Sequence, residues 1–183
     1  MRPLIEIRGL RKCYGERVVF DIPSLTLEAG ESYVLMGDNG CGKTTLLRVL
    51  AGLERAEVGE YRFEGTLVAH ASYPEWLRRQ VIYVHQHPYL FQTSIAHNLA
   101  YGLKSRGLSR AECEPKVREA MEWAGVAHLV EVPPHKLSGG EKQRVALARV
   151  RVLAPRVYLF DEPTANLDEE GRAMTIALIQ ELC

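Results

Sequence analysis

The chain of 183 residues is long enough for one domain with a sizeable core and too short for two full domains. Its 23 Lys and Arg residues balance 23 Asp and Glu residues, so bulk charge gives no attraction to nucleic acid or anionic lipid. The four cysteines show no metal-ligand spacing, and no apolar run approaches the roughly 20 residues that span a bilayer. We therefore expect a cytosolic protein with reduced thiols, which reaches a membrane only through a partner.

Four short segments near the N-terminus are predicted to be β-strands. Leu4–Ile7 alternates apolar and polar residues, Val18–Phe20 is β-branched and aromatic, and Leu25–Leu27 is a separate strand after Pro23. Tyr33–Met36 is apolar on both faces, which is typical of a strand buried within a parallel sheet.

A glycine-rich phosphate-binding loop follows that last segment. Residues 37–44 match the pattern G-x-x-x-x-G-K-[ST], and a helix is predicted from Lys43 to about Ala51, ended by Gly52. Glycines let successive amides turn toward phosphate oxygens, and the helix adds its positive end. Lys43 is expected to reach the β- and γ-phosphates, and the Thr44 hydroxyl to bind Mg²⁺. A glycine-rich turn can match this pattern by chance, but a strand before it and a helix after it favour nucleotide binding. The candidate nucleotide-binding residues here are Gly37, Asp38, Asn39, Gly40, Cys41, Gly42, Lys43, Thr44 and Thr45.

The rest of the chain is predicted to alternate strands with a long helical segment. Tyr61–Phe63 and Val81–Val84 have the composition of strands, and residues 88–153 show mainly helical patterns. Val157–Phe160 is again a buried strand, and Glu169–Leu182 is a closing helix. The pattern predicts an α/β domain with a helical segment inserted between two strands.

One helix in the inserted segment has two possible starts. Apolar residues recur at helical spacing over residues 117–124. Pro115 favours a start near Glu114, whereas Ser109 and Glu112 could cap an earlier turn.

Two acidic residues end the strand at 157–160. Asp161 and Glu162 stand at its carboxyl end, where α/β sheets place ligand-binding groups. Asp161 would hold Mg²⁺ directly or through water, and Glu162 would orient or deprotonate the attacking water. A strand end that simply turns into solvent is the alternative, and the upstream phosphate loop favours the catalytic interpretation.

Residues 137–144, Leu-Ser-Gly-Gly-Glu-Lys-Gln-Arg, form the most specific motif in the chain. Ser138 and Glu141 have the spacing of a capping box, so a helix should start here and run to about Leu153. Gly139 and Gly140 leave the amides of its first turn uncovered, which makes a second anion site. An ordinary capped helix is the plainer interpretation.

This motif resembles the signature of the ATP-binding cassette (ABC) family, and residues 157–162 resemble that family's Walker B strand with its catalytic glutamate. Tyr14 resembles the aromatic residue that stacks on adenine. Gln86 resembles the Q-loop glutamine, which touches Mg²⁺ and water and reports to the membrane partner. Residues 165–168 resemble the D-loop, which spans the dimer interface. The resembling segments cover nearly the whole chain.

The resemblance implies a P-loop NTPase fold with an ABC-type core: a mixed sheet with N-terminal antiparallel strands and central parallel strands, and an inserted helical subdomain. Residues 1–86 and 154–183 would form the nucleotide-binding core of one domain, and residues 87–153 the helical subdomain with the signature motif. Catalysis would fall to Glu162, Gln86 and Lys43.

The family mechanism implies two such domains packed head to tail. Each ATP would lie between the phosphate loop and Tyr14 of one domain and Ser138, Gly139 and Gly140 of the other, with Mg²⁺ held by Thr44, Gln86 and Asp161. The expected partners are a second ABC domain, in a homodimer or heterodimer, and transmembrane permease subunits, with no nucleic acid. The protein would be cytoplasmic and peripheral on the inner face of the cell membrane, hydrolysing ATP to power solute transport.

The chain departs from the family in one respect. The family's switch histidine lies on a strand after the D-loop, whereas every histidine here precedes Asp161. We interpret the chain as truncated at its C-terminus, and we expect it to bind Mg-ATP but turn it over poorly. The histidines are His70, His85, His87, His97, His128 and His135, and the cysteines are Cys13, Cys41, Cys113 and Cys183.

Three kinds of ABC protein are possible. Residues 88–102 resemble the part of the helical subdomain that receives a permease coupling helix, in wording similar to bacterial uptake ATPases for oxyanions such as phosphate or tungstate. A soluble ABC ATPase acting on DNA or ribosomes would carry a long inserted coiled coil or tandem cassettes, and neither is present. A nucleotide-binding regulator stays open because of the missing histidine, although Lys43, Asp161 and Glu162 argue against it.

Overall fold

The computed structural model describes residues 3–68 and 73–182, which divide into two compact units between Tyr83 and Val84. His70 and Cys183 lie outside the described residues. In the described ranges, no helix combines the length and the apolar character needed to cross a membrane.

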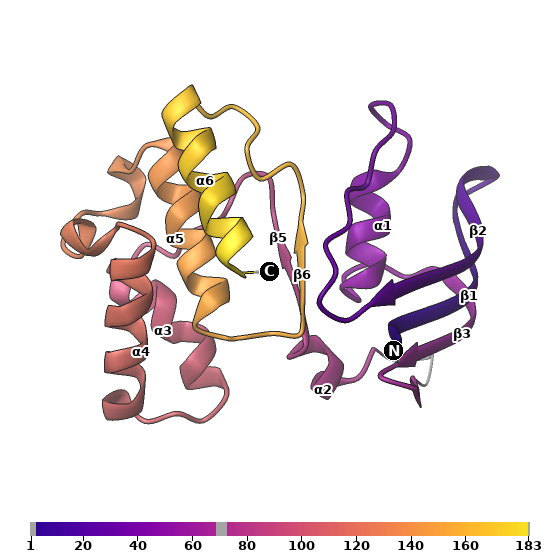
Figure 1. Ribbon diagram of the computed structural model, residues 1–183, viewed down its shortest axis with the longest axis horizontal. Helices are drawn as coiled ribbons and strands as arrows, with labels where there is room; N and C mark the ends of the chain where they lie inside the picture. Colours follow the sequence, from indigo (N-terminus) through magenta and orange to yellow (C-terminus); the bar gives the residue numbers. More distant parts are fainter. Residues whose placement is uncertain (1–2, 69–72, 183) are drawn as a thin grey trace. The chain divides into compact units, whose positions relative to one another are not determined.

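The first unit is built on an antiparallel sheet of strand order β2-β1-β3-β4. Strand β1 (Pro3–Tyr14) pairs with β2 (Arg17–Glu28) on one side and with β3 (Glu57–Phe63) on the other (Figure 1). Strand β4 (Thr66–Leu67) pairs antiparallel with β3 at the edge of the sheet. This confirms the expected N-terminal antiparallel strands.

Two helices accompany this sheet. Helix α1 (Lys43–Leu50) has the predicted start, and α2 (Glu75–Arg78) is a single turn. The core of the unit is apolar: Ile5, Leu10 and Leu77 are fully buried. Burying such side chains contributes about 1.5–3 kcal/mol each, so the fold of this unit is stabilised mainly by its apolar core.

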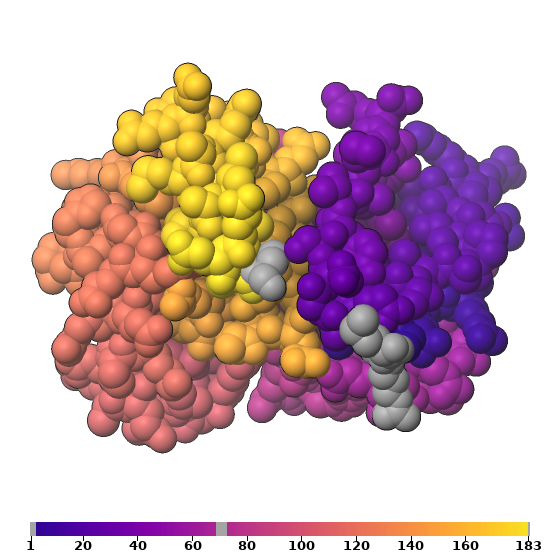
Figure 2. Space-filling model, viewed as in Figure 1, coloured from indigo at the N-terminus to yellow at the C-terminus, as the bar shows by residue number. Residues whose placement is uncertain are grey.

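The second unit is mostly helical. Its main helices share one apolar core whose fully buried members include Leu99, Val126, Val145 and Leu147. These helices are α3 (Ile95–Ser105), α4 (Arg110–Trp123), α5 (Gly139–Arg151) and α6 (Glu169–Leu182), with single 3₁₀ turns at Ala127–Leu129 and Pro134–Lys136. The surface of α6 is the yellow area of Figure 2.

Strand β6 (Val157–Phe160) pairs with β5 (Val81–Val84) in a two-stranded sheet. The Asp161 amide donates to the Val84 carbonyl oxygen at 3.1 Å. Both strands have the predicted bounds, but only Leu159 of β6 is buried. The expected combination of antiparallel strands, parallel strands and a helical region is confirmed.

The prediction of a buried strand at Tyr33–Met36 is wrong. The segment is irregular and exposed, with Val34 at 85% and Met36 at 83% exposure. A strand needs a neighbour for its amides and carbonyls. The sheet of the first unit ends at β2 on one side and at β4 on the other, and neither edge strand pairs with this segment. Apolar composition alone therefore did not make it a strand.

Two further boundaries differ from the prediction. The separate strands expected at Val18–Phe20 and Leu25–Leu27 form one strand, β2, because Pro23 lies on an edge strand, where a missing amide donor is tolerated. Helix α4 begins at the earlier of its two possible starts, because a complete Ser109–Glu112 capping box fixes it there and Pro115 falls inside the helix.

Candidate functional site

The phosphate loop adopts a backbone that only glycine accepts readily. Gly37, Gly40 and Gly42 have φ angles of 154°, 80° and 103°. A Cβ atom on Gly42 would lie 2.7 Å from Cγ1 of Val19, and one on Gly37 would lie 2.8 Å from Sγ of Cys41. Conformation and packing therefore both require glycine at Gly37 and Gly42.

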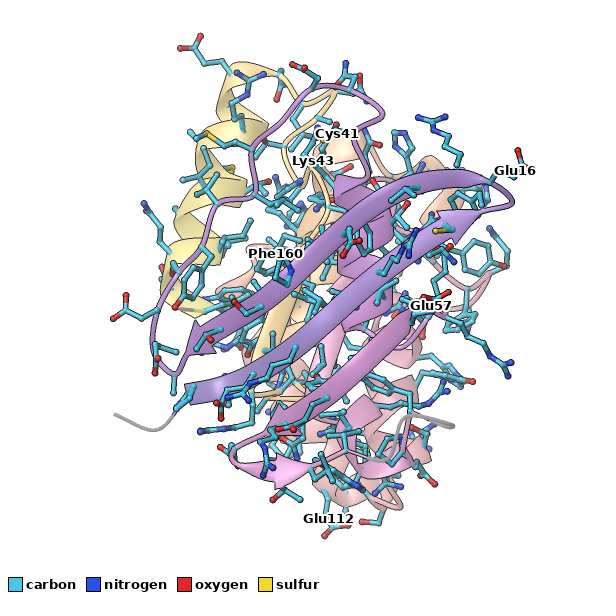
Figure 3. All side chains as sticks on the ribbon, turned by 90° about the vertical axis from the view of Figure 1, so that its right-hand side faces the viewer. Glu16, Cys41, Lys43, Glu57, Glu112 and Phe160 are labelled. Atoms are coloured by element: carbon cyan, nitrogen blue, oxygen red, sulfur yellow. The ribbon has the colours of Figure 1, made fainter. Side chains whose placement is uncertain are left out.

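Lys43 and the start of α1 give this loop its positive character. Nζ of Lys43 donates to the carbonyl oxygens of Gly37 at 2.8 Å and Asp38 at 2.9 Å, so the ammonium is held against the loop backbone. Figure 3 labels Lys43 and Cys41 of this loop. The helix N-cap, Gly42, provides no side-chain hydrogen bond, and the first turn contains no acidic residue. An uncapped helix N-terminus beside a lysine suits a phosphate group.

Tyr14 lies at the end of β1 in the same unit and is half exposed. Its hydroxyl donates to Oε1 of Glu54, and Nζ of Lys12 lies 4.6 Å from the ring centroid and 3.0 Å from the same carboxylate. The Tyr14 hydrogen bond and then Lys12 hold the pKa of Glu54 below its usual range against the opposing effect of burial. The ring is thus held at its hydroxyl, which suits an aromatic residue that stacks on a base. Glu54 was missed by the sequence reasoning because this contact joins residues far apart in the chain.

The second unit brings together Gln86, Asp161 and Glu162. Asp161 is buried at the end of β6, whereas the Glu162 side chain is exposed. Nε2 of Gln86 donates to Oε2 of Glu162 at 3.1 Å. Glu162 has a φ of 45°, an uncommon value for a residue with a side chain. Such backbone strain clusters at functional sites, and here it accompanies the predicted catalytic carboxylate.

The signature helix α5 begins with the predicted capping box. The Ser138 amide donates to Oε2 of Glu141 at 2.7 Å, and the Glu141 amide donates to Oγ of Ser138 at 3.3 Å. Hydrogen bonds to the Glu141 carboxyl from the backbone amide and then the side chain of Ser138 hold the pKa of that carboxyl below its usual range. The helix start is therefore fixed locally, as the sequence predicts.

Gly139 and Gly140 differ from the glycines of the phosphate loop. Neither has a positive φ, and a Cβ atom would lie 3.8 Å or more from its nearest neighbours outside the helix backbone, an ordinary contact distance. A glycine inside a helix costs about 0.5–1 kcal/mol relative to alanine. The fold does not require glycine at these positions, which favours a role for the bare amides themselves.

A pocket of about 590 Å³ opens beside this helix start. It is formed by the signature residues together with the predicted D-loop, whose Asn166 has a φ of 59°. His128 and Arg144 also line it and were missed by the sequence reasoning, although Arg144 lies one helical turn after Gly140. The pocket residues are Gly125, His128, Ser138, Gly139, Gly140, Glu141, Arg144, Asn166, Leu167, Asp168, Glu170, Gly171 and Met174.

The predicted site residues are thus divided between the units. The phosphate loop, with Lys43 and Thr44, and Tyr14 belong to the first unit, and Gln86, Asp161, Glu162 and the signature residues belong to the second. In the described residues, no group of three or more His, Cys, Asp or Glu side chains could hold a metal ion.

Comparison with known proteins identifies the family of this chain. Residues 20–165 match the family model described as ABC transporter. The Fe(3+) ions import ATP-binding protein FbpC of Escherichia coli K12 is 40% identical over 97% of this chain, and the spermidine/putrescine import ATP-binding protein PotA of Pseudomonas aeruginosa is 42% identical over 97%. The tungstate uptake system ATP-binding protein TupC of Peptoclostridium acidaminophilum is 41% identical over 91% of the chain and 75% of its own length.

The chain spans about half of the other two relatives: 51% of FbpC and 48% of PotA. Among solved structures, cbiO1 from Clostridium perfringens, described as part of the ABC transporter complex cbiONQ, matches all of this chain and 74% of its own, with a TM-score of 0.86 and 29% identity. The chain belongs to the ABC transporter family.

Proposed function

We propose that this protein binds and hydrolyses Mg-ATP as the motor subunit of an ABC importer. The observation that carries the proposal is the pairing of Gln86 with Glu162 beside the buried Asp161, in a chain that also holds a complete phosphate loop. The names of the relatives FbpC, TupC and PotA, all uptake or import ATP-binding proteins, support the direction of transport.

The phosphate loop would bind the triphosphate. Its positive-φ glycines turn the backbone, and Lys43 would exchange its two carbonyl partners for phosphate oxygens, which form stronger charge-assisted hydrogen bonds. Tyr14 would stack on the adenine ring. The remaining members of residues 37–45 would contribute amides and hydroxyls.

The residues proposed for Mg²⁺ fit its preference for few protein ligands. Thr44, Gln86 and Asp161 offer a hydroxyl, an amide and a carboxylate oxygen, and no ready-made acidic cage occurs in the described residues. Mg²⁺ usually binds through one or two such groups together with substrate phosphates and water. When bound with ATP, the ion would neutralise charge on the phosphates.

Glu162 would act as the general base. Its carboxylate would accept a proton from the attacking water, and the Gln86 amide, which donates to that carboxylate, would orient it. The buried Asp161 precedes it in the chain, which fixes the end of β6 from which Glu162 projects.

A second copy or a related ABC domain would complete each site with its Ser138, Gly139 and Gly140. The absence of any packing need for these two glycines supports that assignment. Permease subunits would hold the pair at the inner face of the cell membrane. No histidine follows Asp161 in the sequence, and slow turnover of this chain remains a prediction.

The first test is nucleotide binding and turnover by the chain. Mg-ATP should bind to the wild type, bind at least about tenfold more weakly to Lys43→Met, since a charge-assisted hydrogen bond is worth about 1.5–3 kcal/mol, and bind normally to Glu162→Gln. Glu162→Gln should abolish the residual ATPase rate. Equal affinity of Lys43→Met and wild type, or full turnover by Glu162→Gln, would refute the proposal. Co-purification of the wild type with a polytopic membrane protein tests its role as a transporter subunit.

A further inference from the structure

The segment after Gln86 carries an exposed aromatic cluster. Tyr89 is 70% exposed and Tyr101 is 54% exposed, and the Phe91 ring lies between them. The Phe91 centroid is 5.8 Å from that of Tyr89 and 4.7 Å from that of Tyr101. Exposed aromatic side chains of this kind keep one geometry only when the backbone that bears them is fixed.

Asn98 fixes one side of that backbone from helix α3. It is 1% exposed, and its side chain makes hydrogen bonds in both directions with Phe91: Oδ1 accepts from the amide at 2.8 Å, and Nδ2 donates to the carbonyl at 3.0 Å. Nδ2 also lies 3.1 Å from the carbonyl oxygen of Ser94. A buried amide with its donors and acceptor satisfied specifies one loop conformation.

Arg149 fixes the other side from the signature helix α5. Its Nη1 donates to the Tyr89 carbonyl oxygen at 2.7 Å, and its guanidinium carbon lies 5.5 Å from the Phe91 ring centroid. Burial lowers the pKa of the Arg149 guanidinium. Burying a charged group costs free energy, and the contacts with the Tyr89 carbonyl and the Phe91 ring offset that cost. Arg149 is therefore expected to maintain both contacts.

We infer that Arg149 is a positioning residue that joins the aromatic segment Tyr89–Phe91 to the signature helix. Residues Ser138 and Arg149 lie about 16 Å apart along the axis of α5, at ~1.5 Å per residue. Because the helix is continuous between them, a displacement of Tyr89 moves the same element whose first turn holds Gly139 and Gly140. The consequence for nucleotide depends on the proposed function, whereas the mechanical link does not.

Hydrogen exchange of the full chain tests the link in Arg149→Met and Arg149→Lys. Exchange of residues 88–94 should rise by about tenfold or more in Arg149→Met, the factor expected for loss of one hydrogen bond to a charged group. Exchange of residues 138–142 should rise with it by a smaller factor, and that of α6 should not change. Lysine keeps the charge but loses the planar fork, so Arg149→Lys should lie between methionine and the wild type.

Arg151→Met is the matched control. Arg151 leaves the same helix two residues later, lies 4.5 Å from the Trp123 ring centroid and pairs with Glu119 on α4. Its loss should leave exchange at residues 88–94 and 138–142 unchanged. If Arg149→Met unfolds the chain, Arg149→Lys must still raise exchange at 88–94 with α6 unaffected. Unchanged exchange at 88–94 would overturn the inference, and a rise there without any rise at 138–142 would reduce Arg149 to a local contact and overturn the link to the signature helix.

ATP affinity measured on the same variants separates this inference from the proposed function. It should be unaffected by Arg149→Met, because the phosphate loop lies in the other unit. A wild-type chain that fails to bind ATP would refute the proposed function and leave the exchange result standing.

Discussion

Replacing Gly140 by alanine should raise stability and lower function together. The added methyl group would lie 3.8 Å from Nη1 of Arg144 and 3.9 Å from Cα of Gly171, so it fits without a clash. Alanine is about 0.5–1 kcal/mol better than glycine within a helix, and the free energy of unfolding should increase by about that amount. The same methyl group covers the amides of the first turn. If those amides bind a phosphate of the ATP held by a second ABC domain, loss of one such hydrogen bond should weaken dimerisation by about tenfold or more.

The assay is Mg-ATP-driven dimerisation in a Glu162→Gln background, measured by light scattering beside a denaturant titration. Ala111→Gly provides the converse control, because Ala111 lies two residues after the N-cap serine of α4, the position that Gly140 occupies in α5. That control should lose about 0.5–1 kcal/mol of stability and leave dimerisation unchanged. The reasoning is refuted if Gly140→Ala destabilises the chain, or if it dimerises as tightly as its parent.

Two other predictions concern the phosphate loop and the helix caps. Gly42→Ala should destabilise the chain by about 2–4 kcal/mol, because the residue has a positive φ and the new methyl group would clash with Val19. Adding Val19→Ala should recover about 1 kcal/mol of this loss in denaturant titrations. Strictly additive effects of the two substitutions would contradict the steric argument. Hydrogen bonds from Ser109 and Ser138 lower the folded-state pKa values of Glu112 and Glu141. These carboxylates therefore stabilise the fold at pH values above their unfolded pKa of about 4.3. That stabilisation is lost as the pH falls through the lower folded-state pKa values. The double variant Glu112→Gln, Glu141→Gln should therefore show a shallower loss of stability on acidification, and an unaltered acid limb would show that the caps do not contribute.

Local chemistry made part of the fold predictable. The bounds of α6, β5 and β6 and the start of α5 follow from periodicity and a capping box, which are properties of neighbouring residues. Tyr33–Met36 was not predictable in the same way, because apolar composition indicates burial but does not supply the adjacent strand.

The candidate site was predictable as a set of residues but not as a set of contacts. Motif spacing identified Gln86 and Glu162. It did not predict the hydrogen bond between them, because these residues follow two different strands, β5 and β6. Arg149 carried no motif signal at all, since its partners Tyr89 and Phe91 come from a distant part of the chain. Such pairings depend on tertiary packing, which no local pattern encodes.

The two glycine-rich motifs differ in whether a substitution can change function without damaging the fold. At Gly37 and Gly42 the backbone conformation and the nearest side chains demand glycine, so any substitution there damages the loop and the ligand site at once. At Gly139 and Gly140 neither demand exists, and the helix would be more stable with alanine. Opposite changes in stability and association can therefore arise only at the signature motif, and they would show that its glycines serve a bound anion rather than the fold.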